Sequence, residues 1–559
     1  MRILSQKNLV SIALVFFLLV GSVAAFAQTA LPQHAPMRLA PAMPKAPGPG
    51  ELPRGFMPDP YQSPTLAPGN IRALRGAVGA PVASWDWRAL GGVTAVKNQG
   101  AYGTCWIFAG MGDLESKVKI AETPVTDPDY AEQDIIEGVP EGVDSVLGGN
   151  PMEVASHLAM FGTIDEADNA YGTWPAQTPI ADYWNPPKGT PLKNVVEWHS
   201  YGNLEALGAD VTALKGIVQA VGPVCNAVRV DTINTWSTVG GASSPGVVFS
   251  SGAWNSDWVV PYLTGTGDPD HAVVIVGWDD AKQWYGTVDP GSRGAWLVKN
   301  SWGATWGQPS VDQGYFWIAY GSAKIGNAAA AYSQTVFDYD ADETHMYYDE
   351  FASFGSVGWP GPPAQYTVYM ANLFTPVFTG SKELRAVDFW AKQQNLSYEI
   401  KIFDTWNGPS SSPSDQLGTQ SGSVTDAGYY AIFLNTPVSL TSGDEICVQV
   451  KLTDPSNTNP YLIPCEVATS WFPNTVSSES GKCYGRYDPG FSWVDISPSQ
   501  GDIGVRIRLR SAAEPTPTAT ATPEPGVTPT PTATPEPGAT PTATATPRAA
   551  GAGNWMIYQ

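Results

Sequence analysis

The hydrophobic pattern of the chain changes near residue 335, and this change constrains the fold more than any other feature of the 559 residues. From 335 to 510, apolar residues recur at every second position in several short runs, which clusters of Pro, Gly, Ser and Asn separate. Such alternation predicts strands with one apolar and one mostly polar face. We therefore predict an antiparallel β-sandwich over 335–510, with the polar faces turned to water. The clearest runs are Tyr398–Ile402, Ile446–Leu452 and Val505–Leu509.

The preceding region, residues 83–332, mixes two kinds of pattern and is predicted to be a separate α+β domain. Helical spacing favours helices in two segments, and apolar runs favour strands in two others. The chain is also long enough for three to four units at about 150 residues each. The predicted helices are Trp106–Ile120 and Pro151–Phe161, and the predicted strands are Ala272–Gly277 and Trp296–Lys299.

Residues 1–27 have the composition of a cleavable secretory signal peptide. Arg2 and Lys7 accompany the apolar run Leu9–Val20, and the small-residue pattern AFA ends at Ala27. This arrangement predicts export, to a secreted or cell-surface location. A retained membrane anchor is the alternative, because the apolar run is just long enough to span a bilayer if cleavage fails.

Two further segments are too biased in composition to build a core. Residues 28–82 are rich in Pro, Ala and Gly, and we interpret them as a linker or a short pro-segment. Residues 511–559 are rich in Thr, Pro and Ala, and the sequence ATPEPG occurs at 521–526 and again at 533–538. Proline at this density predicts an extended, disordered spacer and tail.

Composition and charge exclude several functions. The formal net charge is −22, which opposes the phosphate attraction on which nucleic-acid binding depends. Five cysteines are too few for a disulfide scaffold. The histidines are scattered and no zinc-binding or phosphate-binding motif occurs, so we predict no metal and no cofactor.

A candidate catalytic residue occurs in residues 96–109, VKNQGAYGTCWIFA. The glycines predict a turn, and the helical pattern that follows places Cys105 at or near a helix N-terminus. There the helix dipole and backbone N–H groups favour an anion, so a thiol beside an imidazolium becomes a nucleophilic thiolate. A lone cysteine is more often a small buried hydrophobic residue.

Three blocks of sequence together resemble the papain-like cysteine peptidases. The resemblance implies a two-lobed peptidase domain over 83–332, with a helical lobe and a β-rich lobe. It also implies hydrolysis of peptide bonds in a protein or peptide substrate, through a thiolate–imidazolium pair and a thioester acyl-enzyme. The blocks are SWDWR and GGVTAVKNQG within 84–100, DHAVVIVGW at 270–278, and KNSWGATWG at 299–307.

The resemblance also implies the catalytic roles. Cys105 is the nucleophile, His271 is the general acid and base, and Asn300 orients the imidazole. Gln99, six residues before the nucleophile, and the backbone N–H of Cys105 would stabilise the oxyanion. Trp302 would shield the hydrogen bond between His271 and Asn300 from water.

Substrate-binding residues follow from the same resemblance. The backbones of Gly148 and Gly149 would pair with an extended substrate, as in strand addition. Ala272 would form a wall of the main specificity pocket, where its small side chain leaves room for an apolar or aromatic residue. Trp302 and Trp306, from the third block, complete the set.

Cysteine usage departs from the family pattern. Tyr102 and Val146 stand where the family has a disulfide, so that bridge is absent. Cys465 and Cys483, 18 residues apart, are candidates for a disulfide in an exported protein, and Cys447 would then be unpaired.

The β-rich region resembles the lectin-like domain that follows papain-like peptidases in some secreted bacterial proteins. That resemblance implies a glycan or cell-surface ligand, and we expect a monomer. Two other functions remain open at this point. One is a surface adhesion protein that uses an inactive peptidase as a scaffold, and the other is an acyltransferase that passes the thioester to an amine.

Overall fold

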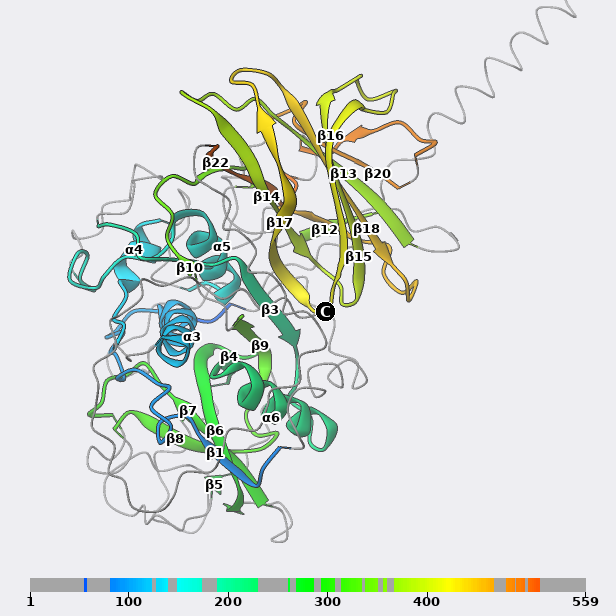
Figure 1. Ribbon diagram of the computed structural model, residues 1–559. Coiled ribbons are helices and arrows are strands. Elements are labelled where there is room, and N and C mark those ends of the chain that lie inside the picture. Colours follow the sequence, from blue (N-terminus) through cyan, green and yellow to red (C-terminus); the bar gives the residue numbers. More distant parts are fainter. Residues whose placement is uncertain are drawn as a thin grey trace, which may run out of the picture. The chain divides into compact units, whose positions relative to one another are not determined.

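Both helices and strands occur before Tyr332, and beyond it the described residues form mostly strands (Figure 1). This agrees with the predicted change near residue 335. The computed structural model describes these residues: 55–57, 81–122, 127–138, 148–172, 189–229, 260–261, 268–285, 293–306, 313–333, 337–349, 355–358, 366–466, 479–487, 489–497 and 501–512.

Both predicted helices are confirmed. The first begins one residue earlier than predicted, at Cys105, and the second has the predicted bounds. Its start is set by Asn150, whose side chain accepts a hydrogen bond from the backbone N–H of Met152, followed by proline at the first helical position. The helices within the described residues are α3 (Cys105–Ala121), α4 (Glu132–Glu137), α5 (Pro151–Phe161) and α6 (Ala209–Val221).

The strands of the first region include both of the predicted ones, which are extended at their ends. They are β1 (Ser84–Asp86), β2 (Lys193–Asn194), β3 (Glu197–Gly202), β4 (Val224–Val228), β5 (Val260–Pro261), β6 (His271–Tyr285), β7 (Arg293–Lys299), β8 (Tyr315–Ala319) and β9 (Asn327–Tyr332). The second region begins with β10 (Phe337–Asp338).

The three alternating runs of the second region all form strands, namely β15, β18 and β22. The strands there after β10 are β11 (Thr344–Met346), β12 (Gly355–Val357), β13 (Tyr366–Phe374), β14 (Lys382–Ala391), β15 (Leu396–Thr405), β16 (Ser414–Val424), β17 (Ala427–Leu440), β18 (Ile446–Asp454), β19 (Ile463–Cys465), β20 (Cys483–Arg486), β21 (Val494–Asp495) and β22 (Val505–Ser511).

One sheet runs through both regions. Its order is β11-β22-β14-β17-β3-β9-β4-β6-β7-β8, with β1 and β5 also paired to β6. The junction is the antiparallel pair β17 and β3, in which Tyr429 lies opposite Trp198. Gly428 is required there, because a Cβ at this position would lie 2.0 Å from the carbonyl oxygen of Trp198. The β-sandwich is therefore joined to the first region by backbone hydrogen bonds, which the sequence did not predict.

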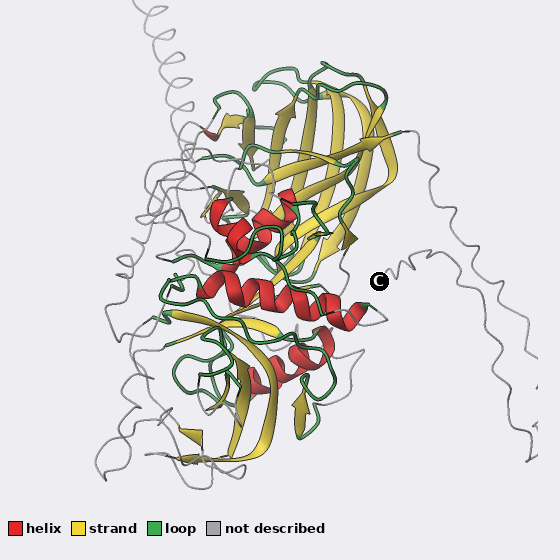
Figure 2. Cartoon of the chain, turned by 90° about the vertical axis from the view of Figure 1, so that its left-hand side faces the viewer, coloured by secondary structure: helices red, strands yellow, loops and turns green. Residues whose placement is uncertain are grey.

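The sandwich has two layers (Figures 1 and 2). A six-stranded sheet of order β16-β15-β18-β13-β20-β21 forms one layer, and β22, β14 and β17 belong to the other. Between them lies a core of fully buried aliphatic and aromatic side chains, including Ile400, Val450, Phe389 and Ile507. Burial of this apolar surface is the main driving force for forming the sandwich.

The prediction that the polar faces meet water is wrong for two strands. On β22, Arg506 and Arg508 are only 2% and 1% exposed, because this face of the strand packs on the first region. On β18, Cys447 and Gln449 are also buried, at 0% and 4% exposure. Alternation identified the strands correctly but could not tell which faces a second layer of protein covers.

The suggested disulfide between Cys465 and Cys483 is absent from the structure, where both are free and buried thiols. Cys465 pairs with Gly355 of β12, whereas Cys483 pairs with Asn372 of β13. The two cysteines thus belong to strands of different sheets, and both side chains pack in the apolar core. Cys447 is a free, buried thiol as well.

Several sequence-based predictions lie outside the described residues. These are the signal peptide at 1–27, residues 28–54 and 58–80 of the linker or pro-segment, and residues 513–559 of the spacer. Among the helices that the structure describes, none is both long enough and apolar enough to span a bilayer.

Candidate active site

Cys105 is the first residue of α3, as the sequence predicted. The glycine-containing turn ends at Thr104, whose carbonyl oxygen accepts the backbone N–H of Ile107 at 2.9 Å. The first turn of α3 carries no acidic side chain, so its dipole is not offset by a negative charge. This end of the helix favours a thiolate at Cys105 over a thiol.

His271 and Asn300 lie together because of the pairing of β6 and β7. His271 is the first residue of β6, and Asn300 follows Lys299, the last residue of β7, which lies opposite Val274. The imidazole Nε2 is 2.8 Å from the Asn300 Oδ1, and both side chains are buried. An amide oxygen at this place fixes the ring and its tautomer, as the aspartate of a serine protease does.

Cys105, at the start of α3, lies at the same site. Its Sγ accepts a hydrogen bond of 3.3 Å from the backbone N–H of Ala272, the residue next to His271. The start of α3 and the start of β6 therefore meet at the sulfur. Three of the four residues that the resemblance implied as catalytic are gathered by these two contacts.

Gln99, the fourth, is held rigidly in the same place. Its Oε1 accepts from the Ser301 hydroxyl at 2.5 Å, and its Nε2 donates to the Tyr102 carbonyl at 2.7 Å. The side chain is fully buried. Because an amide NH2 group carries two hydrogens, the second remains for a developing oxyanion.

Two tryptophans build an aromatic cover at the imidazole. Trp302 is stacked on His271 with ring centroids 4.7 Å apart and an angle of 25° between the planes. Trp306 packs edge-on against Trp302 at 5.0 Å and supports it. Trp302 is itself only 9% exposed, and its shielding of the hydrogen bond between His271 and Asn300 stays a prediction.

A segment far upstream in sequence lies across this site. Met57 N–H donates to the Gly149 carbonyl at 2.9 Å, and Gly149 N–H donates to the Gly55 carbonyl at 2.8 Å. These bonds make a parallel bridge between Phe56 and Gly149. Gly149 therefore pairs with a segment of the protein itself, and its pairing with an extended substrate stays a prediction.

Glycine is needed on both sides of this bridge, because neighbouring atoms leave no room for a Cβ. A Cβ at Gly148 would lie 2.6 Å from the Met57 Cε, and one at Gly149 would lie 2.4 Å from the Trp106 ring. A Cβ at Gly55 would lie 1.7 Å from the Gly103 carbonyl oxygen. No larger residue fits at these positions without moving backbone or a buried ring.

The thiol is fully buried beneath this segment. Burial raises the pKa of Cys105 to about 12, the nearby Asp270 carboxylate adds to the rise, and the backbone N–H groups of Ala272 and Gly55 oppose it. Burial of the sulfur thus favours the neutral thiol over the nucleophilic thiolate. A low thiol pKa, which the sequence predicted from the helix terminus, is wrong for the site in this covered state.

Sequence reasoning missed several residues of the site. Ser301 holds Gln99, and its place in the NSWG block was an available signal. Asp270 receives the N–H groups of both Gly55 and Phe56 on its carbonyl oxygen, at 3.2 Å each. No local signal could have found that contact, because 214 positions separate Phe56 from Asp270 in the sequence. The described residues contain no group of three or more His, Cys, Asp or Glu arranged to hold a metal.

A family comparison agrees with this geometry. Residues 81–335 match the profile described as "Papain family cysteine protease". We call these residues the papain-family domain after this match. Residues 346–508 match the profile described as "Lectin like domain". The papain-family domain and the lectin-like domain thus follow one another in the order that the sequence predicted.

Two curated relatives each match less than half of this chain. Cysteine proteinase 2 of Zea mays is 32% identical over 267 residues, which are 47% of this chain and 62% of the relative. Cathepsin S of Mus musculus is 30% identical over 237 residues, which are 42% of this chain and 57% of the relative. The chain spans about 60% of the length of these two relatives.

Solved structures match both domains. The cysteine protease and lectin-like domains of Cwp84, a surface layer associated protein of Clostridium difficile, superpose with a TM-score of 0.60. The identity is 21%, and the match covers 77% of this chain and 89% of that one. A second Cwp84 structure, of a cysteine-to-alanine variant after propeptide cleavage, gives a TM-score of 0.59 at 21% identity, covering 77% of this chain and 99% of that one. At this identity the likeness establishes the fold alone.

Proposed function

We propose that the protein is a secreted cysteine endopeptidase that hydrolyses peptide bonds by the papain-like mechanism. One observation carries the proposal: the Sγ of Cys105, at the start of α3, lies 3.3 Å from the N–H of Ala272, directly after the histidine that Asn300 orients. A thiol at a helix N-terminus beside an oriented imidazole is the arrangement that makes a thiolate nucleophile.

The mechanism uses these groups in order. The Nε2 of His271 is engaged with Asn300, so proton exchange with the thiol takes place at Nδ1. The thiolate attacks the scissile carbonyl carbon, and the electron pair moves to the oxygen, where the N–H of Cys105 and the Gln99 amide stabilise it. The C–N bond then breaks as the imidazolium gives its proton to the leaving amine. Water, deprotonated by His271, hydrolyses the thioester and restores the thiol.

The test is a cleavage profile of the full chain on a peptide library, with and without a thiol-alkylating reagent. We expect cleavage that alkylation of the chain abolishes, with two hydrolytic products for each cut. Products joined to an added amine would instead indicate acyl transfer. Binding of peptides without cleavage, before and after removal of the covering segment, would contradict the proposal and favour an inactive scaffold.

The covering segment Gly55–Met57 is proposed to act as the inhibitory part of a short pro-segment. It occupies the Gly149 backbone and buries Cys105, and the group of Gly55 that faces the sulfur is an N–H rather than a carbonyl carbon. Such a contact blocks substrate without offering a bond to cleave. The side chains of Phe56 and Met57 are 2% and 4% exposed, so the segment is well packed in the cleft.

Replacing Gly55 by alanine is expected to open the site. The added Cβ would lie 1.7 Å from the Gly103 carbonyl oxygen, a clash between two backbones that only displacement of the segment relieves. Without the cover, the pKa of Cys105 falls from about 12 toward the lower values of helix N-terminal thiols. At pH 7 we expect iodoacetamide to label Cys105 at least about 10-fold faster, since the thiolate fraction rises about tenfold for each unit of pKa lost.

The matched control is Gly216→Ala, which adds the same methyl group in α6, where no atom lies within 4 Å of the new Cβ. This variant is expected to label at the wild-type rate. Equal labelling of Gly55→Ala and wild type would show that the segment does not restrain the thiol.

A further inference from the structure

Two arginines of the lectin-like domain reach into the papain-family domain and contact α5. The Nη2 of Arg506 donates to the Ser156 hydroxyl at 2.7 Å. The Nη2 of Arg508 donates to the Val195 carbonyl at 3.2 Å and lies 3.4 Å from the Ala159 carbonyl. Both arginines belong to β22, and α5 lies between this strand and α3 in Figure 1.

Arg506 is fixed from within its own domain. Its Nε and Nη2 bind the two carboxylate oxygens of Asp349 at 2.9 and 2.8 Å. This two-point contact sets the plane of the guanidinium, and both side chains are essentially inaccessible to water. Because the guanidinium of Arg506 is held in this way, its hydrogen bond to Ser156 fixes the position of α5.

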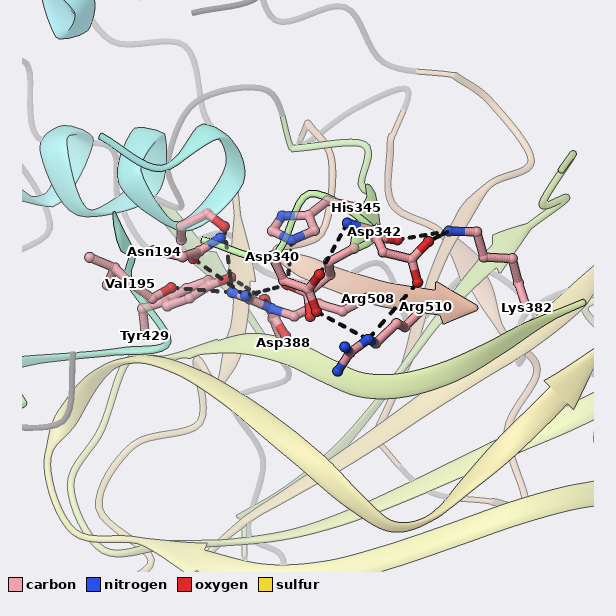
Figure 3. Close-up of polar contacts among 12 residues, drawn as sticks. Asn194, Val195, Asp340, Asp342, His345, Lys382, Asp388, Tyr429, Arg508 and Arg510 are labelled. Carbon is pink, nitrogen blue, oxygen red and sulfur yellow. Dashed lines mark hydrogen bonds and ion pairs between the residues drawn. The ribbon is translucent and has the colours of Figure 1, made fainter. Parts of the chain in front are cut away.

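Arg508 is held by two different carboxylates (Figure 3). Its Nε binds Asp388 at 2.7 Å, and its Nη1 binds Glu343 at 3.0 Å. His345 lies 2.7 Å from the same Glu343 oxygen. Burial opposes ionisation of Glu343, but His345 and Arg508 lower its pKa to about 2, so the carboxylate is charged throughout the neutral range.

The N-terminus of α5 contacts the covering segment directly. Its cap, Asn150, donates from Nδ2 to the Met57 carbonyl at 2.9 Å. The preceding residue, Gly149, makes the two backbone bonds to the covering segment. On its other side α5 packs tightly on α3, where a Cβ at Gly110 would lie only 3.0 Å from Val154. One buried helix thus connects the arginines, the substrate-pairing backbone and the helix of the nucleophile.

We propose that Arg506 and Arg508 are positioning residues of the peptidase, which hold α5 so that Gly149 and Asn150 keep the geometry in which an extended substrate pairs with them. This inference rests on the proposed peptidase function. Gly55–Met57 shows that an extended chain does pair at this place. In this arrangement the lectin-like domain is a structural part of the substrate site, and not an appended binding module alone.

The test removes a single contact, with Ser156→Ala. This change keeps the ion pair of Arg506 with Asp349 and deletes only the hydrogen bond to α5. In the Gly55→Ala background, where the cleft is open, we expect KM for a peptide substrate to rise about 3- to 10-fold, with kcat within about twofold of the parent. In the wild-type background we expect amide hydrogens of 149–155 to exchange about 10-fold faster.

The matched control is Ser456→Ala, which deletes a serine hydroxyl bound to a carboxylate, that of Asp454, in the turn after β18. It is expected to change neither KM nor exchange at 149–155. Values for Ser156→Ala equal to those of this control would overturn the proposal, and so would a fall of kcat with KM unchanged. Amide hydrogen exchange can be measured on a protein without peptidase activity. It therefore still tests the role of Arg506 if the chain does not cleave peptides.

Discussion

Cys105→Ala is expected to abolish peptide hydrolysis by the uncovered enzyme, with a loss in kcat of about four orders of magnitude or more. In the proposed mechanism the sulfur of Cys105, which accepts the N–H of Ala272, forms the thioester. The imidazole beside it serves only to move protons. Folding should be preserved, since the change leaves α3 and its apolar contacts in place. The measurement is the initial rate of peptide cleavage by Gly55→Ala with and without Cys105→Ala.

The control for this variant is Cys225→Ala. Cys225 is also a free and fully buried thiol of the papain-family domain, on β4, and it has no part in the mechanism. We expect the Cys225 variant to keep activity within about threefold of the parent, because a core substitution outside the reacting groups alters stability more than chemistry. Undiminished turnover by Cys105→Ala would refute the cysteine peptidase assignment.

The second large effect concerns Arg508→Ala. Removal of the guanidinium leaves the buried carboxylates of Asp388 and Glu343 without their shared cation, and it removes the hydrogen bond to the Val195 carbonyl. Loss of one partner from a buried ion pair costs about 3 to 5 kcal/mol. We expect the free energy of unfolding, from urea denaturation followed by tryptophan fluorescence, to fall by about this amount.

Lys401→Ala provides the contrast. Lys401 pairs with Glu399 at 2.8 Å on β15, but both side chains are about one-third exposed, so water screens the pair. Its removal is expected to cost less than about 1 kcal/mol. If Arg508→Ala costs no more than Lys401→Ala, the ion pairs at the domain boundary do not stabilise the folded chain.

Local sequence signals identified the secondary structure and much of the site. Helical spacing gave α5 its bounds, and the glycine turn before Cys105 placed that residue at a helix start, as observed. These features depend on contacts between residues close in sequence, namely capping, turn conformation and periodic burial. The blocks around His271 and Asn300 located the two residues that the pairing of β6 with β7 brings to 2.8 Å.

The predictions from sequence were wrong where surfaces far apart in the sequence pack against each other. The arginines of β22 had the pattern of a solvated face, and their burial follows only from the packing of α5 against that strand. The lowered thiol pKa was expected from the helix terminus, but burial of the sulfur reverses the direction. Cys465 and Cys483 had a plausible spacing for a bridge, yet they lie in different sheets.

The sequence by itself determined that this chain has an α+β region followed by an alternating β region, and it predicted the cysteine, histidine and asparagine of the candidate site. Only the tertiary structure decided that one sheet joins the two regions, that Gly55–Met57 covers the sulfur, and that buried arginines connect the sandwich to α5. The physical reason is that periodicity and turns report the preferences of neighbouring residues. Burial and pKa depend on which surface, far away in sequence, replaces water.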